Sequence, residues 1–181
     1  IAGSSVHDPR NRRYTGFAVS SVNTYFRSLR CRVNSSFSAG GTCTLTPPAQ
    51  QWVEAVNASM NGGHCEGMAV LALLLNKGLL KASDFGGDTA NALKVDGNDK
   101  LAREIAYWYT TQGTSPTRNA ELNTLMPSEV VDKLKESFQP GASETYTLGI
   151  YKTVDGKKKE GHAITPFGLV DAGNGKFEIA V

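Results

Sequence analysis

The sequence predicts an α+β fold, in which a buried helix packs against an antiparallel sheet. The most apolar run of the chain, residues 68–75, has helical spacing, and so do two later stretches. From Glu144 onward, apolar residues alternate with polar ones, as they do in half-buried strands. The chain has 181 residues, of which 40% are apolar and 20% charged, so it is long enough to bury one substantial core. We therefore expect a single domain.

Within that domain, residues 1–50 form an N-terminal segment of undefined role, and residues 51–181 carry the chemistry. Cys31 and Cys43 flank a loop rich in Ser and Gly that can bring them together. Closing so short a loop contributes roughly 3 kcal/mol. We predict a Cys31–Cys43 disulfide, with two buried free thiols as the alternative. The disulfide would place the protein outside the cell or on its surface.

Composition excludes several classes of function. A formal net charge of +2 is too small for a nucleic-acid footprint, so no nucleic-acid partner is expected. The apolar run is far shorter than the roughly 20 residues that a membrane span needs. The sequence has no Cys-x-x-Cys or His-x-x-x-His spacing, and Gly175-Lys176 lacks the other residues of a phosphate loop. We therefore predict neither a metal nor another cofactor.

The elements before the apolar run bring the chain to Cys65. A short strand is expected at residues 44–46, followed by a helix over residues 49–61 that Gly62 and Gly63 end. The next helix is apolar on nearly every face and stops at Gly78, so it should be buried almost all round. Cys65 lies in its first turn, where unpaired N–H groups and the helix dipole stabilise thiolate over thiol. Such a cysteine is suited to be a nucleophile.

Two further helices are predicted to be core without chemistry of their own. Asn98 or Asp99 caps a helix that ends near Gly113. A polar stretch over residues 114–123 leads to a helix that starts at Pro127 and that Pro140-Gly141 stops. Its apolar stripe consists of Val130, Leu134 and Phe138.

The last part of the chain is expected to form the sheet. Tyr146, Leu148 and Ile150 share one face of a strand, and Asp155-Gly156 makes a turn. Residues 161–170 then form a strand, residues 171–175 a tight turn and residues 176–181 a second strand. The lysines at 157–159 are interpreted as a solvated turn, with an acidic partner as the alternative.

A nucleophilic cysteine needs a base, and His162 is the candidate. It lies at the start of a strand, after a glycine that leaves access. The alternative is a core histidine with ordinary hydrogen bonds. His64 is a poor rival, because adjacent side chains at a helix start diverge by roughly 100°.

Two motifs resemble those of a bacterial branch of the papain-like cysteine peptidases. They are Gly63-His64-Cys65-Glu66-Gly67-Met68-Ala69 and, later in the chain, Gly161-His162-Ala163-Ile164-Thr165-Pro166. The order of elements from Trp52 to Val181 agrees more loosely, and residues 1–50 match no such pattern. The resemblance implies a papain-like fold and a secreted thiol peptidase that hydrolyses polypeptides. It makes Cys65 the nucleophile and His162 the general base and acid.

The sequence departs from that family at the third catalytic group. An Asn or Asp should orient His162 from the neighbouring strand. If the last hairpin pairs Asp171 with Lys176, however, the facing position lies beyond Val181. We therefore expect a second chain, cut from the same precursor by proteolytic processing, to complete the sheet and the triad. The alternative is a sample that lacks its C-terminal part.

A second departure concerns the oxyanion hole. Papain-like enzymes usually carry a Gln six residues before the cysteine, where this chain has Ser59. Asn61 is the candidate side-chain donor, alongside the backbone N–H of Cys65. A loop-shaping or helix-capping role for Asn61 is the alternative.

Two other functions fit the same residues. One is an amide or acyl transferase of the transglutaminase type, which would use the Cys65–His162 pair with an amine as the acceptor. The other is a papain-like binding module without catalytic activity, which the incomplete triad and the missing Gln favour. Substrate sequence preference is not predicted, because the pocket walls cannot be located from one sequence.

Overall fold

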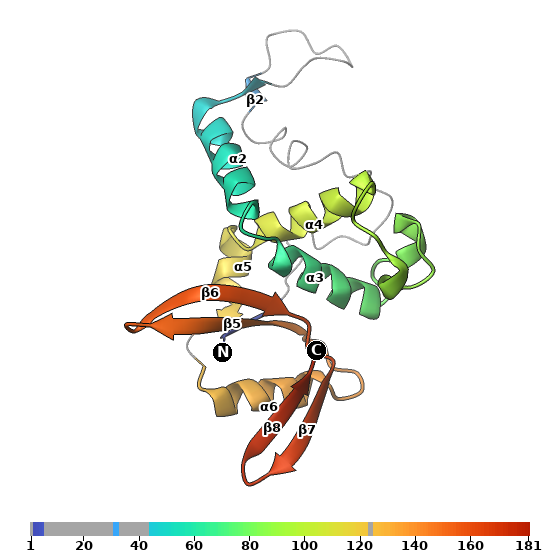
Figure 1. Cartoon of the computed structure of the whole chain (residues 1–181), viewed down its shortest axis with the longest axis vertical. Helices are drawn as coiled ribbons and strands as arrows, with labels where there is room; N and C mark the ends of the chain where they lie inside the picture. Colours follow the sequence, from blue (N-terminus) through green and yellow to red (C-terminus); the bar gives the residue numbers. More distant parts are fainter. Residues whose placement is uncertain (1, 6–30, 33–43, 123–124) are drawn as a thin grey trace.

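A computed structural model describes residues 2–5, 31–32, 44–122 and 125–181, and it confirms the α+β class (Figure 1). The main sheet has four antiparallel strands in the order β4-β1-β5-β6. These strands are β1 (Ala2–Ser5), β4 (Glu121–Leu122), β5 (Tyr146–Val154) and β6 (Lys157–Ile164). Within the described residues, β6 is therefore an edge strand.

The remaining elements surround this sheet. Two short strands, β2 (Cys31–Arg32) and β3 (Thr44–Leu45), pair with each other. The helices are α2 (Pro47–Met60), α3 (Cys65–Asn76), α4 (Asp99–Thr111), α5 (Ser115–Ala120) and α6 (Pro127–Ser137), with two 3-10 turns, η1 (Ala82–Phe85) and η2 (Ala90–Ala92). A second hairpin consists of β7 (Gly168–Gly173) and β8 (Lys176–Ala180).

The helix that begins at Cys65 is buried, as predicted, along most of its length. Val70, Leu71, Leu73 and Leu74 are buried in α3, whereas Met68 is 47% exposed. One side of α3 packs on α4, where Leu101, Ile105 and Trp108 complete two apolar clusters. The predicted cap of α4 is confirmed, because the Asn98 side chain accepts the N–H of Leu101 at 3.1 Å.

A glycine allows the close crossing of α3 and α4. A Cβ built on Gly67 would lie 2.1 Å from the carbonyl oxygen of Ile105 and 3.0 Å from the backbone nitrogen of Tyr109. Any side chain at this position would therefore force the two helix backbones apart. The contact fixes α4 against the first turns of α3, next to Cys65.

The main sheet separates α3 from α6. Leu148 of β5 packs in a cluster with Val130 and Leu134 of α6, and Ile164 and Ile179 border that cluster. The preceding residue, Thr147, points to the other face and contacts Glu66 of α3. In Figure 1, α3 accordingly lies above β5 and β6, and α6 lies below them.

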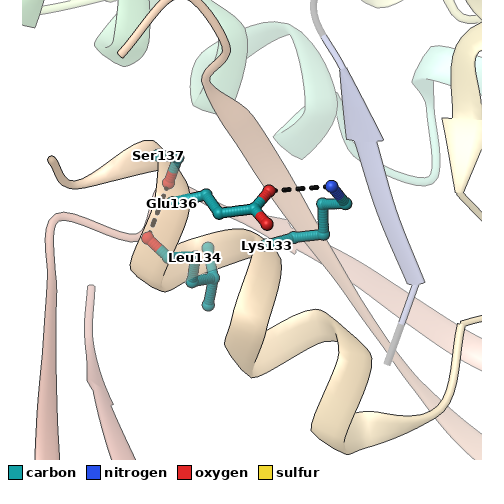
Figure 2. Close-up of polar contacts among 4 residues, drawn as sticks. All are labelled: Lys133, Leu134, Glu136 and Ser137. Carbon is teal, nitrogen blue, oxygen red and sulfur yellow. Dashed lines mark hydrogen bonds and ion pairs between the residues drawn. The ribbon is translucent and has the colours of Figure 1, made fainter. Parts of the chain in front are cut away.

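Helix α6 buries two residues of its predicted apolar stripe, Val130 and Leu134, but not the third. Phe138, assigned to the apolar stripe, is 36% exposed. On the polar side, Nζ of Lys133 lies 2.8 Å from Oε2 of Glu136, and this contact raises the pKa of Lys133 (Figure 2). The Ser137 hydroxyl donates to the Leu134 carbonyl at 2.9 Å.

Several predicted boundaries differ from the structure. Helix α2 begins at Pro47, so the division at residue 50 falls inside it, and β1 belongs to the main sheet although it lies within residues 1–50. The polar stretch over residues 114–123 contains α5 and β4. Its strand was missed because two residues of pairing leave no periodic pattern. Cys43 lies outside the described residues, so the Cys31–Cys43 disulfide stays a prediction.

The last strands also differ from expectation. The single strand expected over residues 161–170 is two strands, since β6 ends at Ile164 and β7 starts at Gly168. Pro166 is buried in the link, and proline donates no hydrogen bond to a ladder. The hairpin register is shifted, because Asp171 pairs with Phe177 rather than with Lys176.

Candidate functional site around Cys65

The turn between α2 and α3 sets the position of Cys65. Asn61 follows the last residue of α2, and its backbone N–H donates to the Ala58 carbonyl at 3.2 Å, as the N–H of Gly62 does to the Ser59 carbonyl. Gly63 has a φ of 119°, a backbone conformation that side chains rarely allow. His64 then precedes α3, and its carbonyl accepts the N–H of Met68 at 3.1 Å. Cys65 is thus the first residue of α3, with its backbone N–H at the helix start.

The thiol of Cys65 meets the strand that carries His162. Cys65 is a half-buried free cysteine, and its Sγ accepts the backbone N–H of Ala163 at 3.4 Å. Ala163 pairs with Gly149 of β5, but its N–H points away from β5 to the sulfur. Since β6 is the edge strand among the described residues, the thiol lies beside the edge that these strands leave open, level with the residue after His162.

The His162 side chain leaves β6 on the face turned to α6. Leu148 pairs with Ile164 in the cluster against α6, and Ile150 pairs with His162 one step further along. Because side chains alternate along a strand, His162 shares the face of Ile164. His162 is exposed there, on the face opposite to the one on which Thr147 contacts α3.

A β-bulge lies directly before His162. Ile150 faces His162 and Lys152 faces Lys159, so two residues, Glu160 and Gly161, oppose Tyr151 alone. Glu160 has a φ of 48°, which marks the bulge. Bulges redirect the side chains that follow them, and this one sets the direction of His162.

Two side-chain hydrogen bonds tie α3 to the sheet near Cys65. The Thr147 hydroxyl donates to Oε1 of Glu66 at 3.1 Å. The Thr165 hydroxyl donates to the carbonyl of Ala69 at 2.9 Å. One bond reaches β5 and the other reaches the link after β6, so the start of α3 is held at two points.

The predicted oxyanion-hole residues lie at the end of α2. Asn61 is exposed, and its backbone contacts are those of a helix end, in agreement with the alternative capping role. Ser59, which stands in place of the expected Gln, accepts the Tyr109 hydroxyl at 3.0 Å and donates to the Val56 carbonyl at 2.7 Å. The Asn61 side chain stays the candidate donor.

The expected position of the third catalytic group, beyond Val181, does not follow from the hairpin that the structure shows. It assumed one continuous strand from His162 to the turn, but β6 and β7 belong to different sheets. Asp171 is held in the second hairpin, where its Oδ1 accepts the N–H of Gly173 at 2.8 Å. In the described part of the chain, the third group therefore has no assigned residue.

A cavity of about 960 Å³ lies at the opposite end of α3. Its lining includes Leu75 and Lys81 beside α3, Phe138 after α6, and Phe167 in the link to β7, but neither Cys65 nor His162. An enzyme that used Cys65 as its nucleophile would therefore not carry out its reaction in this cavity.

Several contacting residues were not singled out from the sequence. Thr147, Tyr151 and Thr165 became visible only through the register of β5 and β6 and the packing of α3. Gly161 was interpreted from the sequence only as leaving access to His162, and its contact with the Tyr151 ring depends on the pairing of β5 and β6.

Neither a metal cluster nor a spanning helix is found in the described ranges. No group of three His, Cys, Asp or Glu residues there could hold a metal ion. Equally, none of the helices described is both long and apolar enough to cross a membrane. The chain matches no protein-family model, and no curated protein or solved structure matches it.

Proposed function

We propose that the chain is a papain-like thiol peptidase in which Cys65 and His162 carry the reaction. The observation behind this proposal is the hydrogen bond from Ala163 to the Cys65 sulfur, because it joins the two motifs at one place. A cysteine at a helix start thus meets the strand of a histidine, and thiol catalysis further needs the imidazole within hydrogen-bond reach of the sulfur.

The reaction would proceed in two steps. The Cys65 thiolate attacks the carbonyl carbon of a peptide bond, forming a C–S bond, and the backbone N–H of Cys65 donates to the developing oxyanion. His162, protonated by the thiol, gives its proton to the leaving amine as the C–N bond breaks. Water, deprotonated by His162, then attacks the thioester and releases the carboxylate and the thiol.

Substitution of the two reacting side chains tests this proposal. Cys65→Ala and His162→Ala should each lower kcat for a polypeptide substrate by at least about 10³-fold. His64→Ala is the matched control, since His64 lies next to Cys65 but bonds the Met60 carbonyl through Nδ1 at 3.4 Å. Activity that survives in Cys65→Ala would show that another group performs the hydrolysis.

A binding module with a papain-like fold is the second candidate. The position of His162 on the α6 face favours it, because α3, the helix that carries the thiol, contacts the other face of the sheet. Alkylation of Cys65 by iodoacetamide separates the two functions. A thiol that reacts no faster than free cysteine at neutral pH, together with peptide binding that Cys65→Ala leaves unchanged, would establish the binding module.

The acceptor of the acyl group distinguishes the transferase from the peptidase. With an added primary amine, a transferase would form the amide of that amine, whereas a peptidase would release the free carboxylate. Mass spectrometry of the products distinguishes the two outcomes.

We further propose that the protein is located outside the cell or on its surface. We also propose that a second chain from the same precursor belongs to the mature protein. Mass spectrometry of the natural protein under native and denaturing conditions tests the second chain, because a complex would separate into two masses. A single mass under both conditions would contradict it. Non-reducing peptide mapping tests the Cys31–Cys43 disulfide on which the location depends.

A further inference from the structure

We propose that the β5–β6 hairpin is a docking surface for an acidic, partly apolar polypeptide segment, whose carboxylates Lys157 and Lys159 bind. The inference goes beyond the proposed peptidase activity and does not depend on it, because the surface consists of side chains other than Cys65 and His162. It gives a role to the run of lysines that the proposed reaction does not use.

Three lysines gather on one face of the hairpin. Lys152 pairs directly with Lys159, and Val154 pairs directly with Lys157. Paired residues of neighbouring strands project to the same face of a sheet, and so do residues two positions apart on one strand. The side chains of Lys152, Lys157 and Lys159 therefore share a face, and all three residues are exposed.

The facing lysines repel each other. Like charges directly opposite one another on neighbouring strands destabilise a sheet. Glu160 relieves the repulsion in part, because its Oε2 lies 3.6 Å from Nζ of Lys152. Lys157 and Lys159, by contrast, form no ion pair with any residue that the structure describes. Two ammonium groups are thus available to an anionic ligand.

Apolar side chains border the lysines. Ile150 and Val154 lie two residues to either side of Lys152 on β5, so they share its face, and they are 40% and 41% exposed. Apolar, basic and apolar side chains therefore follow one another along β5 at intervals of about 6.6 Å. Alternate side chains of an extended polypeptide have the same spacing. A segment with apolar, acidic and apolar residues at alternate positions would match this row.

The surface is open to a partner. Residues 150–157 are all exposed. In Figure 1, the turn of the hairpin projects past α6. A polypeptide can therefore reach the lysines without displacing the described part of the chain.

The composition of the surface favours a polypeptide over a membrane or a nucleic acid. Residues 146–164 carry four lysines against two carboxylates, Asp155 and Glu160, so their net charge is +2. Anionic membranes are bound by clusters of about four to eight Lys or Arg, and the two carboxylates bring the hairpin below that charge. Proteins that bind single-stranded nucleic acid stack the bases on aromatic rings, whereas Ile150 and Val154 are aliphatic.

Binding of designed peptides tests the proposal. The probe is a fluorescein-labelled peptide in which Leu and Glu alternate at every second position, separated by Ser. One control peptide has Gln in place of each Glu, and another has Ser in place of each Leu. The protein is the whole chain of 181 residues with Cys65→Ala, so that no peptide is hydrolysed.

Fluorescence anisotropy should show a preference for the probe. We expect the probe to bind at least about tenfold more tightly than the Gln peptide at low salt, and its affinity to fall as salt screens the charges. The peptide without Leu should bind at least about threefold more weakly than the probe, because it buries no apolar surface against Ile150 and Val154. Equal binding of the probe and the Gln peptide would overturn the proposal.

Two double variants that lose the same charge locate the site. Lys157→Gln combined with Lys159→Gln should weaken binding of the probe by about fivefold or more. The matched control combines Lys94→Gln with Lys176→Gln, since these two lysines are exposed and lie outside the hairpin. It should weaken binding by less than about twofold. Equal losses in the two double variants would reveal an effect of net charge alone and contradict a docking surface.

Two further measurements can overturn the proposal. Binding to phosphatidylserine vesicles by a protein that does not bind the probe would identify a membrane surface instead. In the absence of peptide, Lys159→Gln should leave Tm unchanged or raise it, because it removes the repulsion of Lys152. A lower Tm would mean that Lys159 serves the stability of the hairpin and not a partner. None of these measurements uses peptidase activity, so a failure of the proposed function and a failure of the docking surface are distinguishable.

Discussion

The backbone N–H of Ala163 donates a hydrogen bond to Sγ of Cys65 at 3.4 Å, between residues 98 positions apart in sequence. This bond leaves the open edge of β6 and meets the first residue of α3. Because it involves the residue next to His162, the alignment of α3 with β6 decides whether thiol and imidazole can cooperate. The contacts that hold α3 in place are therefore the first targets for mutation.

The Thr147–Glu66 hydrogen bond should stabilise the fold and the position of α3. Thr147 is 1% exposed, and its hydroxyl is bonded to a carboxylate. Thr147→Val, which keeps the shape and removes the hydroxyl, should lower the free energy of unfolding by about 1.5–3 kcal/mol. Urea denaturation measures the change. Thr153→Val is the control, because Thr153 is an exposed threonine on the same strand; an equal loss in both variants would mean that the bond to Glu66 contributes nothing.

Gly67→Ala should separate α3 from α4. The new Cβ would lie 2.1 Å from the Ile105 carbonyl oxygen, and a backbone atom cannot yield as a side chain can. We expect a loss of about 1–3 kcal/mol or more in unfolding free energy and a lower Tm. Gly113→Ala is the matched control, since its Cβ would meet the Thr110 carbonyl at an ordinary 3.5 Å. A Gly67→Ala protein as stable as Gly113→Ala would contradict the close crossing.

Gly161→Ala should displace the Tyr151 ring and cost stability. The ring belongs to a flexible side chain, so it can move away from the added methyl group, and we expect a cost of about 1–2 kcal/mol. In a double-mutant cycle, Tyr151→Ala should remove most of that cost, because the ring is what the methyl group meets. Additive effects of the two substitutions, measured by urea denaturation, would show that the residues do not touch.

Stability should fall at alkaline pH because of Tyr146. Burial raises the pKa of Tyr146 above its ordinary 10.0, and the negative charge of Glu144 adds to the effect. Between the unfolded and the folded pKa, the unfolded chain loses this proton while the folded protein keeps it. The stabilisation is therefore complete below about pH 10 and is lost as the pH rises through the folded pKa. Tyr146→Phe should flatten the decline of unfolding free energy between about pH 9 and 11; an identical slope in both proteins would exclude Tyr146 as its source.

Local patterns predicted most of the secondary structure between residues 44 and 181. The cap at Asn98, the helix start at Pro127, the apolar run after Cys65 and the Asp155-Gly156 turn are all encoded within a few neighbouring residues. The prediction failed for strands that are very short or whose pairing partners lie far along the chain. Strands β1 and β4 are formed by small segments whose partners lie far along the chain, and such pairing leaves no periodic signal.

The site was predicted only in part for the same reason. Motif spacing singled out Cys65 and His162, and the fold brings the thiol beside the residue after His162. The bulge at Glu160 and Gly161, by contrast, depends on how β5 and β6 align. A shift of one residue reverses the face of every later side chain, so the exit of His162 toward α6 could not be read from the sequence.

The sequence by itself determined the α+β class, the buried helix that starts at Cys65 and the two residues proposed to react. Those features follow from helical or alternating periodicity and from the chemistry of single residues. Only the tertiary structure decided that Gly67 lets α4 approach, that Thr147 and Thr165 hold α3, and that Tyr151 covers Gly161. These are contacts between distant segments, and their geometry is set by packing and strand register, which no local stretch of sequence contains.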